Sequence, residues 1–168
     1  MGKEKEVDDA NAICNLASDL FDGERGLSVN RSKAFDLWLH AGKELNHGPS
    51  YFAIAQNYLN GHGVRRDLKK AIFYWELSAM CRSVRGRRNL GANEWKSSNF
   101  DKALKHWMIA VRDGDERSLK DIQKMYKDGH ATKDEYAKAL NARQSYLDEI
   151  RTFQRDEAAA FHSTYKYY

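Results

Sequence analysis

The chain has 168 residues, of which 42% are hydrophobic and 31% charged, and it contains a single proline, which favours long helices. This length suits one domain or one short repeat array, and an aromatic content of 12% argues against disorder, because large rings bury enough surface to offset chain entropy. Lys and Arg total 28 against 24 Asp and Glu, and the net charge of +4 is too small to indicate nucleic-acid binding by itself.

The cysteines and the N-terminus exclude further classes of protein. Cys14 and Cys81 are 67 residues apart, so neither a disulfide framework nor a CxxC metal or redox site is expected. The start MGKEKEVDD has no apolar region typical of a signal peptide, and no apolar window is long enough to span a membrane. We therefore expect an intracellular, cytoplasmic protein that does not associate with a membrane.

The first unit of the chain predicts two helices joined by a turn. The helices are expected over NLASDLFDG (15–23) and KAFDLWLHAG (33–42). Gly23 ends the first helix, because a chain reversal there needs a positive φ. Asn30 is a suitable N-cap for the second helix, and Ala34 and Trp38 lie four residues apart on its apolar face.

The second unit repeats this pattern over AIAQNYLNG (53–61) and KAIFYWELSA (70–79). Gly61 and Gly63 occupy the turn, Asp67 is the N-cap, and Ala71 and Trp75 occupy the register of the alanine and tryptophan in the first unit. The two glycines could alternatively cradle a phosphate. However, no strand precedes them and neither GxxxxGK[ST] nor GxGxxG is present, so a structural turn is favoured.

The third unit contains NLGANEWKS (89–97) and KALKHWMIAV (102–111). Its turn is four residues shorter than that of the second unit, and Ser97 stands where the others have glycine. Asn99 is the expected N-cap, and Ala103 and Trp107 continue the register of the core. Trp95 lies outside that register and could be exposed.

The fourth unit departs from the pattern. It begins with DIQKMYKDG (121–129), which ends in Gly129, and TKDE places Thr132 and Glu135 at the spacing of a capping box. A long helix is expected from 133 to about 160, with Arg143 nearest the position of the missing tryptophan. Terminal repeats are usually atypical, because one of their faces has no neighbouring repeat.

Several motifs in one register resemble the Sel1-like repeat family, which is related to the tetratricopeptide repeat. In the second unit the matching residues are Ile54, Ala55, Tyr58, Gly61, Gly63, Val64, Asp67, Lys70, Ala71, Tyr74, Trp75 and Ala79. The first unit keeps Leu16, Ala17, Gly23, Lys33, Ala34 and Trp38, and the third keeps Leu90, Gly91, Lys102, Ala103 and Trp107. The resemblance covers about residues 10–146.

The resemblance implies an all-α fold, a right-handed superhelical α-solenoid of about four helix-turn-helix repeats with a long C-terminal capping helix. We expect a flexible N-terminus over 1–8, the repeat array over 9–146, a helical extension over 147–160 and a tail over 161–168. The tyrosine-rich tail either frays or docks on the array. The motifs are most similar to a eukaryotic, algal-type subgroup, whose members often carry an N-terminal zinc finger. This chain has no CxxC, so a stand-alone or truncated array is expected.

The resemblance also implies a non-catalytic adaptor that binds a protein or peptide on its concave face. The first helix of each pair lines that face in related folds, which makes Asp19, Asn57 and Asn93 the candidate contacts. Asparagine suits a peptide backbone because its side chain both donates and accepts hydrogen bonds. The partner, the pathway and the oligomeric state stay open.

Two alternatives to the adaptor follow from the residues themselves. A basic patch would bind nucleic acid or an acidic ligand, through Arg65, Arg66, Arg82, Arg85, Arg87 and Arg88. A weaker alternative is an enzyme site hidden in the groove, although neither HExxH nor GxSxG is present. The six histidines show no metal-ligand spacing, so no metal or other cofactor is expected.

Overall fold

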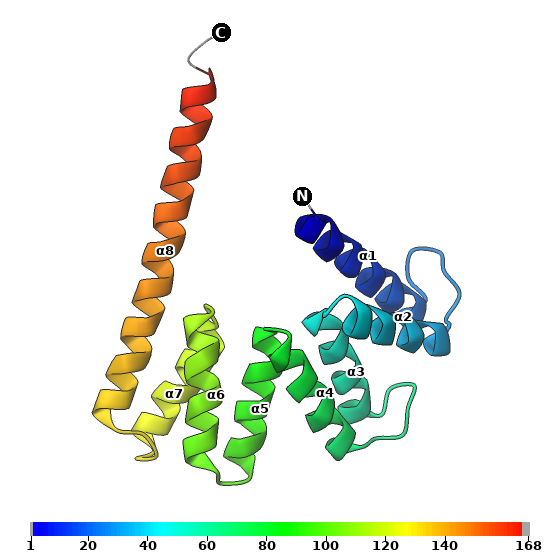
Figure 1. The fold of residues 1–168 in the computed structure, drawn as a ribbon. Coiled ribbons are helices and arrows are strands. Elements are labelled where there is room, and N and C mark those ends of the chain that lie inside the picture. Colours follow the sequence, from blue (N-terminus) through cyan, green and yellow to red (C-terminus); the bar gives the residue numbers. More distant parts are fainter. Residues whose placement is uncertain (1, 166–168) are drawn as a thin grey trace. The chain divides into compact units, whose positions relative to one another are not determined.

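The computed structural model describes residues 2–165, and within this range the chain is helical apart from its turns (Figure 1). No strand occurs among these residues, which confirms the all-α fold. The helices of the described range are α1 (Gly2–Asp22), α2 (Arg31–Glu44), α3 (Gly48–Asn60), α4 (Leu68–Met80), α5 (Val84–Lys96), α6 (Phe100–Arg112), α7 (Glu116–Lys127) and α8 (Lys133–Tyr165).

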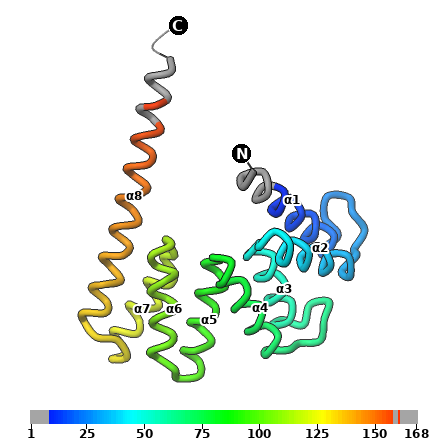
Figure 2. Tube along the Cα trace, in the orientation of Figure 1, coloured from blue at the N-terminus to red at the C-terminus, as the bar shows by residue number. Residues whose placement is uncertain are grey.

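The chain divides into two compact units, residues 1–90 and 91–168, and the division falls inside α5. In unit 1, α1 packs on α2, α2 on α3 and α3 on α4, so each helix contacts the next one along the chain (Figure 2). In unit 2, α6 packs on α7, and both helices pack on α8. Contacts between successive helices are typical of an α-helical repeat solenoid.

The first helix of each pair begins earlier than its repeated segment predicted. Helices α3, α5 and α7 begin at Gly48, Val84 and Glu116, each five residues before its predicted segment. Helix α1 begins at Gly2 and includes most of the segment 1–8 that was expected to be a flexible N-terminus. Residues 3–22 contain neither glycine nor proline, so nothing in that segment interrupts a helix.

The glycine turns repeat at the level of single hydrogen bonds. Gly23 and Gly61 both have a φ of 76°, the left-handed conformation that their position predicted. At the end of α1, the N–H groups of Gly23 and Glu24 donate to the carbonyl oxygen of Asp19 at 2.8 and 2.9 Å. At the end of α3, those of Gly61 and His62 donate to the carbonyl oxygen of Asn57 at 2.8 and 3.1 Å. The two turns therefore close their helices in the same way.

The predicted N-caps form in two of three cases. The side chain of Asn30 accepts the N–H of Lys33 at 3.0 Å, and Asp67 accepts the N–H of Lys70 at 3.1 Å. Asn99 occupies the N-cap position of α6, but its side chain forms no cap bond. Its amide nitrogen instead donates to Oε2 of Glu94 at 2.7 Å, because the shortened turn holds the two residues together.

The capping box of the fourth unit is present as predicted. The N–H of Glu135 donates to Oγ1 of Thr132 at 3.2 Å, and the N–H of Thr132 donates to Oε2 of Glu135 at 2.8 Å. The bond from the N–H of Thr132, and a further one from its hydroxyl to the same Oε2 at 2.8 Å, lower the pKa of the Glu135 carboxyl below its usual value. The reciprocal bonds fix the start of α8 at Lys133, directly after Thr132.

The alanines and tryptophans of the register lie in the core of unit 1. Ala34 and Ala71 are fully buried, and Trp38 and Trp75 are 3% and 4% exposed. The Nε1–H of Trp38 donates to the carbonyl oxygen of Cys14 at 3.3 Å, so this indole joins α2 to α1. In the same way, the Nε1–H of Trp75 donates to Oε1 of Gln56 and joins α4 to α3.

Unit 2 has its own core, in which Ala103 and Trp107 are buried together with residues of α7 and α8. Trp95 packs against this core and is half-buried, so it is not exposed. Its ring lies 4.9 Å from that of Phe100 and 6.0 Å from that of Trp107, measured between ring centroids. The short turn between α5 and α6 brings Trp95 and Phe100 together, which covers the indole.

Helix α8 begins in the core of unit 2 and continues past it. Ala139 is fully buried, and Nη1 of Arg143 donates to the carbonyl oxygen of Gly114 at 3.2 Å. The residues from 151 to 157 are all exposed. Of the tail over 161–168, residues 166–168 and all the side chains lie outside the described part of the chain. The domain boundaries 9–146 and 147–160 stay predictions.

Candidate functional site

Two of the three predicted contact residues are largely buried in unit 1. Asp19 and Asn57 are each 8% exposed. One carboxylate oxygen of Asp19 lies 3.0 Å from Nη1 of Arg25, and the side-chain amide of Asn57 donates to the carbonyl oxygen of Ala53 at 3.0 Å. In addition, the backbone carbonyl oxygen of each residue accepts the two hydrogen bonds that end its helix. Their polar groups therefore stabilise the ends of α1 and α3.

The third contact residue, Asn93, lies on α5 in unit 2 and is half-buried. Its carbonyl oxygen accepts the Oγ–H of Ser97 at 3.1 Å. Of the three candidates, only Asn93 keeps an accessible side chain.

A polar contact that the sequence did not predict lies next to Asn57. Oε1 of Gln56 accepts a hydrogen bond from Nε1 of Trp75 at 3.3 Å and another from Nδ2 of Asn89 at 3.1 Å. One amide oxygen thus connects α3, α4 and α5. The sequence signal was weak, because Gln56 is one of several polar residues in its segment and its partners are 19 and 33 residues away.

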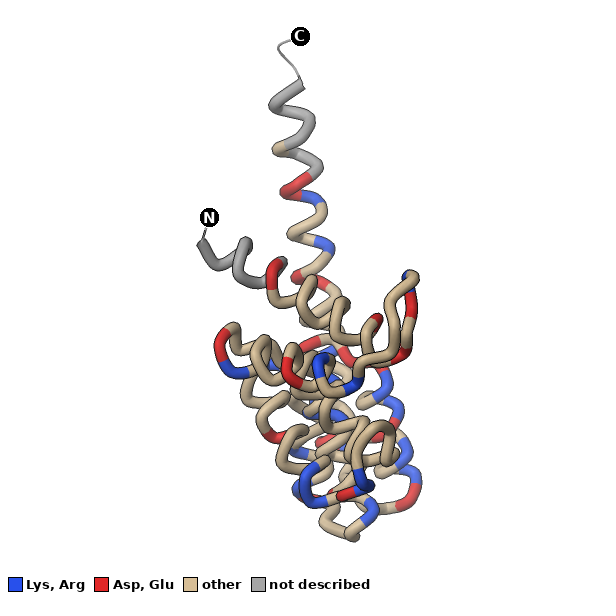
Figure 3. Tube along the Cα trace, turned by 90° about the vertical axis from the view of Figure 1, so that its right-hand side faces the viewer, with Lys and Arg blue, Asp and Glu red and all other residues tan. Residues whose placement is uncertain are grey.

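The six arginines of the predicted basic patch do not form one patch. Arg65 and Arg66 precede α4, whereas Arg82 follows its end and the others lie on α5. The 13 residues of α4 separate the two groups by about 20 Å at the usual helical rise. Figure 3 shows the charged residues distributed over the molecule. The six arginines therefore lie in two groups, because the two ends of a helix are far apart.

The arginines on α5 are partly used in packing. Nη2 of Arg87 donates to the carbonyl oxygen of Ala79 at 3.1 Å, which ties α5 to the end of α4. The guanidinium of Arg85 lies 5.9 Å from the ring centroid of Phe52. Arg82 and Arg85 are exposed, while Arg87 and Arg88 are half-buried. The second group therefore contains two exposed arginines, Arg82 and Arg85.

One histidine joins two helices through a buried polar contact. His47 is 8% exposed, its Nδ1 lies 2.8 Å from Oγ of Ser50, and its Nε2 lies 3.0 Å from Oδ1 of Asn11. Burial lowers the pKa of His47 below its ordinary value, because it disfavours the charged imidazolium. This residue holds the start of α3 against α1.

The described residues contain no group of three or more His, Cys, Asp or Glu side chains that would hold a metal ion. Cys14 and Cys81 are free thiols, both half-buried against the core of unit 1. Over the described range, no helix combines the length and the apolar character needed to cross a membrane.

Comparison with known proteins gives a family match and a fold match. The model of the Sel1 repeat matches residues 10–43 and 48–83. The Sel1 repeat protein from Oxalobacter formigenes is similar in structure, with a TM-score of 0.66 and 22% identity over 88% of this chain and 60% of that chain. The protective antigen c5321 of uropathogenic Escherichia coli, described as an SLR fold, has a TM-score of 0.68 and 19% identity over 88% of this chain and 32% of its own.

The likeness to the two solved structures shows the fold and confirms the all-α repeat solenoid. The chain spans less than two thirds of either solved chain. No curated protein matches the chain at a significant level. None of the comparisons supports the eukaryotic, algal-type subgroup that the motifs resembled.

Proposed function

We propose that the chain is a non-catalytic adaptor that binds a segment of another protein, because the Sel1 repeat model matches residues 10–43 and 48–83. The observation that supports this proposal is the repeat match itself, since Sel1 repeat proteins generally mediate protein–protein interaction. A Sel1-repeat solenoid is also typically non-catalytic. The proposed place of action is the cytoplasm, where the two free thiols would stay reduced.

The proposed binding surface is formed by the first helices of the pairs, on the face that is concave in related folds. Asn93 is the candidate contact, because its side chain is accessible and has both a donor and an acceptor for a peptide backbone. Asp19 and Asn57 would contribute indirectly, since their backbone carbonyl oxygens accept the hydrogen bonds that close α1 and α3 and their side chains are largely buried.

Affinity capture with quantitative mass spectrometry tests this function. The tagged wild-type chain is compared with Asn93→Arg and with the matched control Asn141→Arg, which changes an exposed asparagine of α8 in the same unit. We expect a set of proteins that the wild type and the control retain and that Asn93→Arg loses. Retention of no protein above the tag alone contradicts the adaptor function, while equal retention by all three variants contradicts only the role of Asn93.

The nucleic-acid alternative has no observation in its favour. A continuous basic stripe with exposed aromatic rings would be needed to follow a phosphate backbone, and the six arginines are divided between the two ends of α4.

A further inference from the structure

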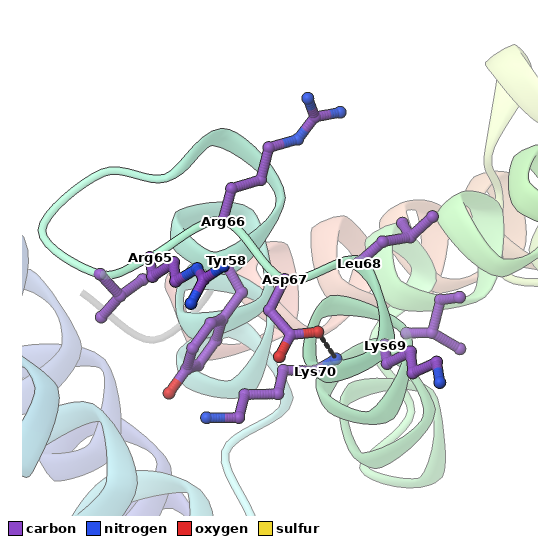
Figure 4. A pocket seen from close by; sticks show the side chains of 9 residues that line it. Tyr58, Arg65, Arg66, Asp67, Leu68, Lys69 and Lys70 are labelled. Carbon is purple, nitrogen blue, oxygen red and sulfur yellow. Dashed lines mark hydrogen bonds between the residues drawn. The ribbon is translucent and has the colours of Figure 1, made fainter.

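A pocket of about 770 Å³ lies in unit 1, where α3 ends and α4 begins (Figure 4). Its apolar lining comes from Tyr58 at the end of α3, Val64 in the loop, and Leu68 and Ile72 on α4. Leu68 is 49% exposed and Val64 and Ile72 are half-buried, so the pocket presents apolar side chains to solvent.

The remaining lining of this pocket is strongly cationic. Four basic side chains, those of Arg65, Arg66, Lys69 and Lys70, lie within six consecutive residues, and all four are exposed. None of these four side chains forms an ion pair with a carboxylate of the described residues. The basic pocket, as we call this site, therefore presents four positive charges to solvent.

The one carboxylate in the lining, that of Asp67, offsets only one of these four charges. Oδ1 of Asp67 accepts the N–H of Lys70 at 3.1 Å, so the carboxylate is directed into the first turn of α4 (Figure 4). The ammonium of Lys70 lies over the ring of Tyr58, 5.0 Å from its centroid. Figure 4 shows the side chain of Arg66 extending away from Tyr58 and the other labelled side chains, into solvent.

We propose that the basic pocket docks a short acidic segment of a partner protein that also carries one large apolar side chain. The acidic residues would pair with Arg65, Arg66 and Lys69, since arginine presents two parallel donors to a carboxylate. The apolar side chain would be buried against Leu68 and Ile72 and provide the anchor. This inference rests on the proposed adaptor function, and it adds to it a second contact surface, in unit 1, together with the chemistry of the segment that would bind there.

The aromatic ring in the basic pocket favours an acidic peptide over a nucleic acid. Tyr58 is half-buried and stacks on Tyr74 with an interplanar angle of 5° and a centroid distance of 5.7 Å. Lys70 also lies over this ring, so both Tyr74 and Lys70 compete with a nucleobase for contact with it. Single-stranded nucleic acids are bound largely through such stacking, which this site does not offer.

Fluorescence anisotropy with a defined probe tests the proposal on the full chain. The probe is the labelled peptide Asp-Glu-Asp-Phe-Glu-Asp-Glu, and its controls are the amide analogue Asn-Gln-Asn-Phe-Gln-Asn-Gln and the acidic peptide with Ala in place of Phe. We expect a Kd of about 10–200 µM for the probe, as for a contact much smaller than a standard protein interface. Each control peptide should bind about tenfold more weakly, and the affinity should fall as salt is raised.

A matched pair of variants separates a specific site from net charge. Arg65→Glu with Arg66→Glu changes the basic pocket, while Arg82→Glu with Arg85→Glu changes two exposed arginines at the other end of α4. Both double variants lower the formal net charge from +4 to 0. We expect the first variant to weaken probe binding about tenfold or more and the second to change it less than twofold.

Three results would overturn the proposal. In the first, the two double variants weaken probe binding equally. In the second, the amide peptide binds as tightly as the acidic probe. In the third, a labelled oligonucleotide of the same charge binds more tightly than the probe. Circular dichroism and thermal melting confirm that each variant is folded. If the proteins captured by the wild type are also captured by the Arg65→Glu, Arg66→Glu variant, the adaptor function stands while the basic pocket fails as its site.

Discussion

Gly91 lies directly against the indole of Trp107. A Cβ atom added at residue 91 would lie 2.5 Å from both Cδ1 and Nε1 of that ring. Gly91 is in the middle of α5 and Trp107 in the middle of α6, so the missing side chain lets these two helices approach closely. In the sequence both residues belong to the repeat pattern, and the structure shows the contact that connects them.

We expect Gly91→Ala to destabilise unit 2, because the methyl group overlaps the indole and the buried ring has little room to move. Overpacking of this kind costs about 1–3 kcal/mol, more than the helix propensity gained from alanine. Urea denaturation measures the loss.

A double-mutant cycle isolates this steric term. In the background Trp107→Ala the added methyl should cost much less, since the clashing ring is gone. If Gly91→Ala costs the same in both backgrounds, the cost does not come from the contact with Trp107.

The left-handed turn at Gly61 makes a second prediction. Its φ of 76° is costly for alanine but tolerated by asparagine. We expect Gly61→Ala to lower the free energy of unfolding by about 1–2 kcal/mol and Gly61→Asn by less. Chemical denaturation of both variants beside the control Asn60→Ala, at an exposed helix end, measures the difference. A loss as large for Asn as for Ala would point to packing and not to backbone conformation.

His47 makes stability depend on pH. Burial lowers its folded-state pKa below the ordinary value of 6.5, so the unfolded chain binds a proton more readily than the folded chain. The contribution of His47 to stability is therefore complete above pH 6.5 and decreases as the pH falls from 6.5 through the folded-state pKa.

Denaturation series between about pH 5 and 8 measure this dependence. We expect the decrease to be smaller in His47→Gln, which keeps a polar group but cannot be protonated. The control is His40→Gln at an exposed position of α2. A slope that both variants share with the wild type would exclude His47 as its source.

Amide hydrogen exchange should be slow in the first part of α8 and fast in its later part. The segment from 133 to 146 contacts the core through Ala139 and the hydrogen bond between Arg143 and Gly114, so its amides should exchange slowly. Residues 151–157 are all exposed, and a helix without packing frays, so their amides should exchange within seconds. Mass-spectrometric exchange at several protein concentrations measures both segments. Slow exchange over 151–157 would contradict this prediction.

The sequence by itself determined the features that depend on residues close to one another in the chain. The repeat register, the left-handed glycines, the caps at Asn30 and Asp67 and the capping box of Thr132 with Glu135 all arise from contacts within a few residues. Such contacts form in the same way wherever the local pattern occurs, which is why four imperfect copies sufficed to predict an all-α repeat fold.

Only the tertiary structure decided which side chains are covered and which stay accessible. Trp95 is half-buried, Asp19 and Asn57 are buried, and Arg65 and Arg82 lie at opposite ends of α4. Each of these outcomes depends on the length of a turn or helix and on which face packs against a neighbour. For the same reason, the basic pocket became visible only once the end of α3 and the start of α4 were placed together.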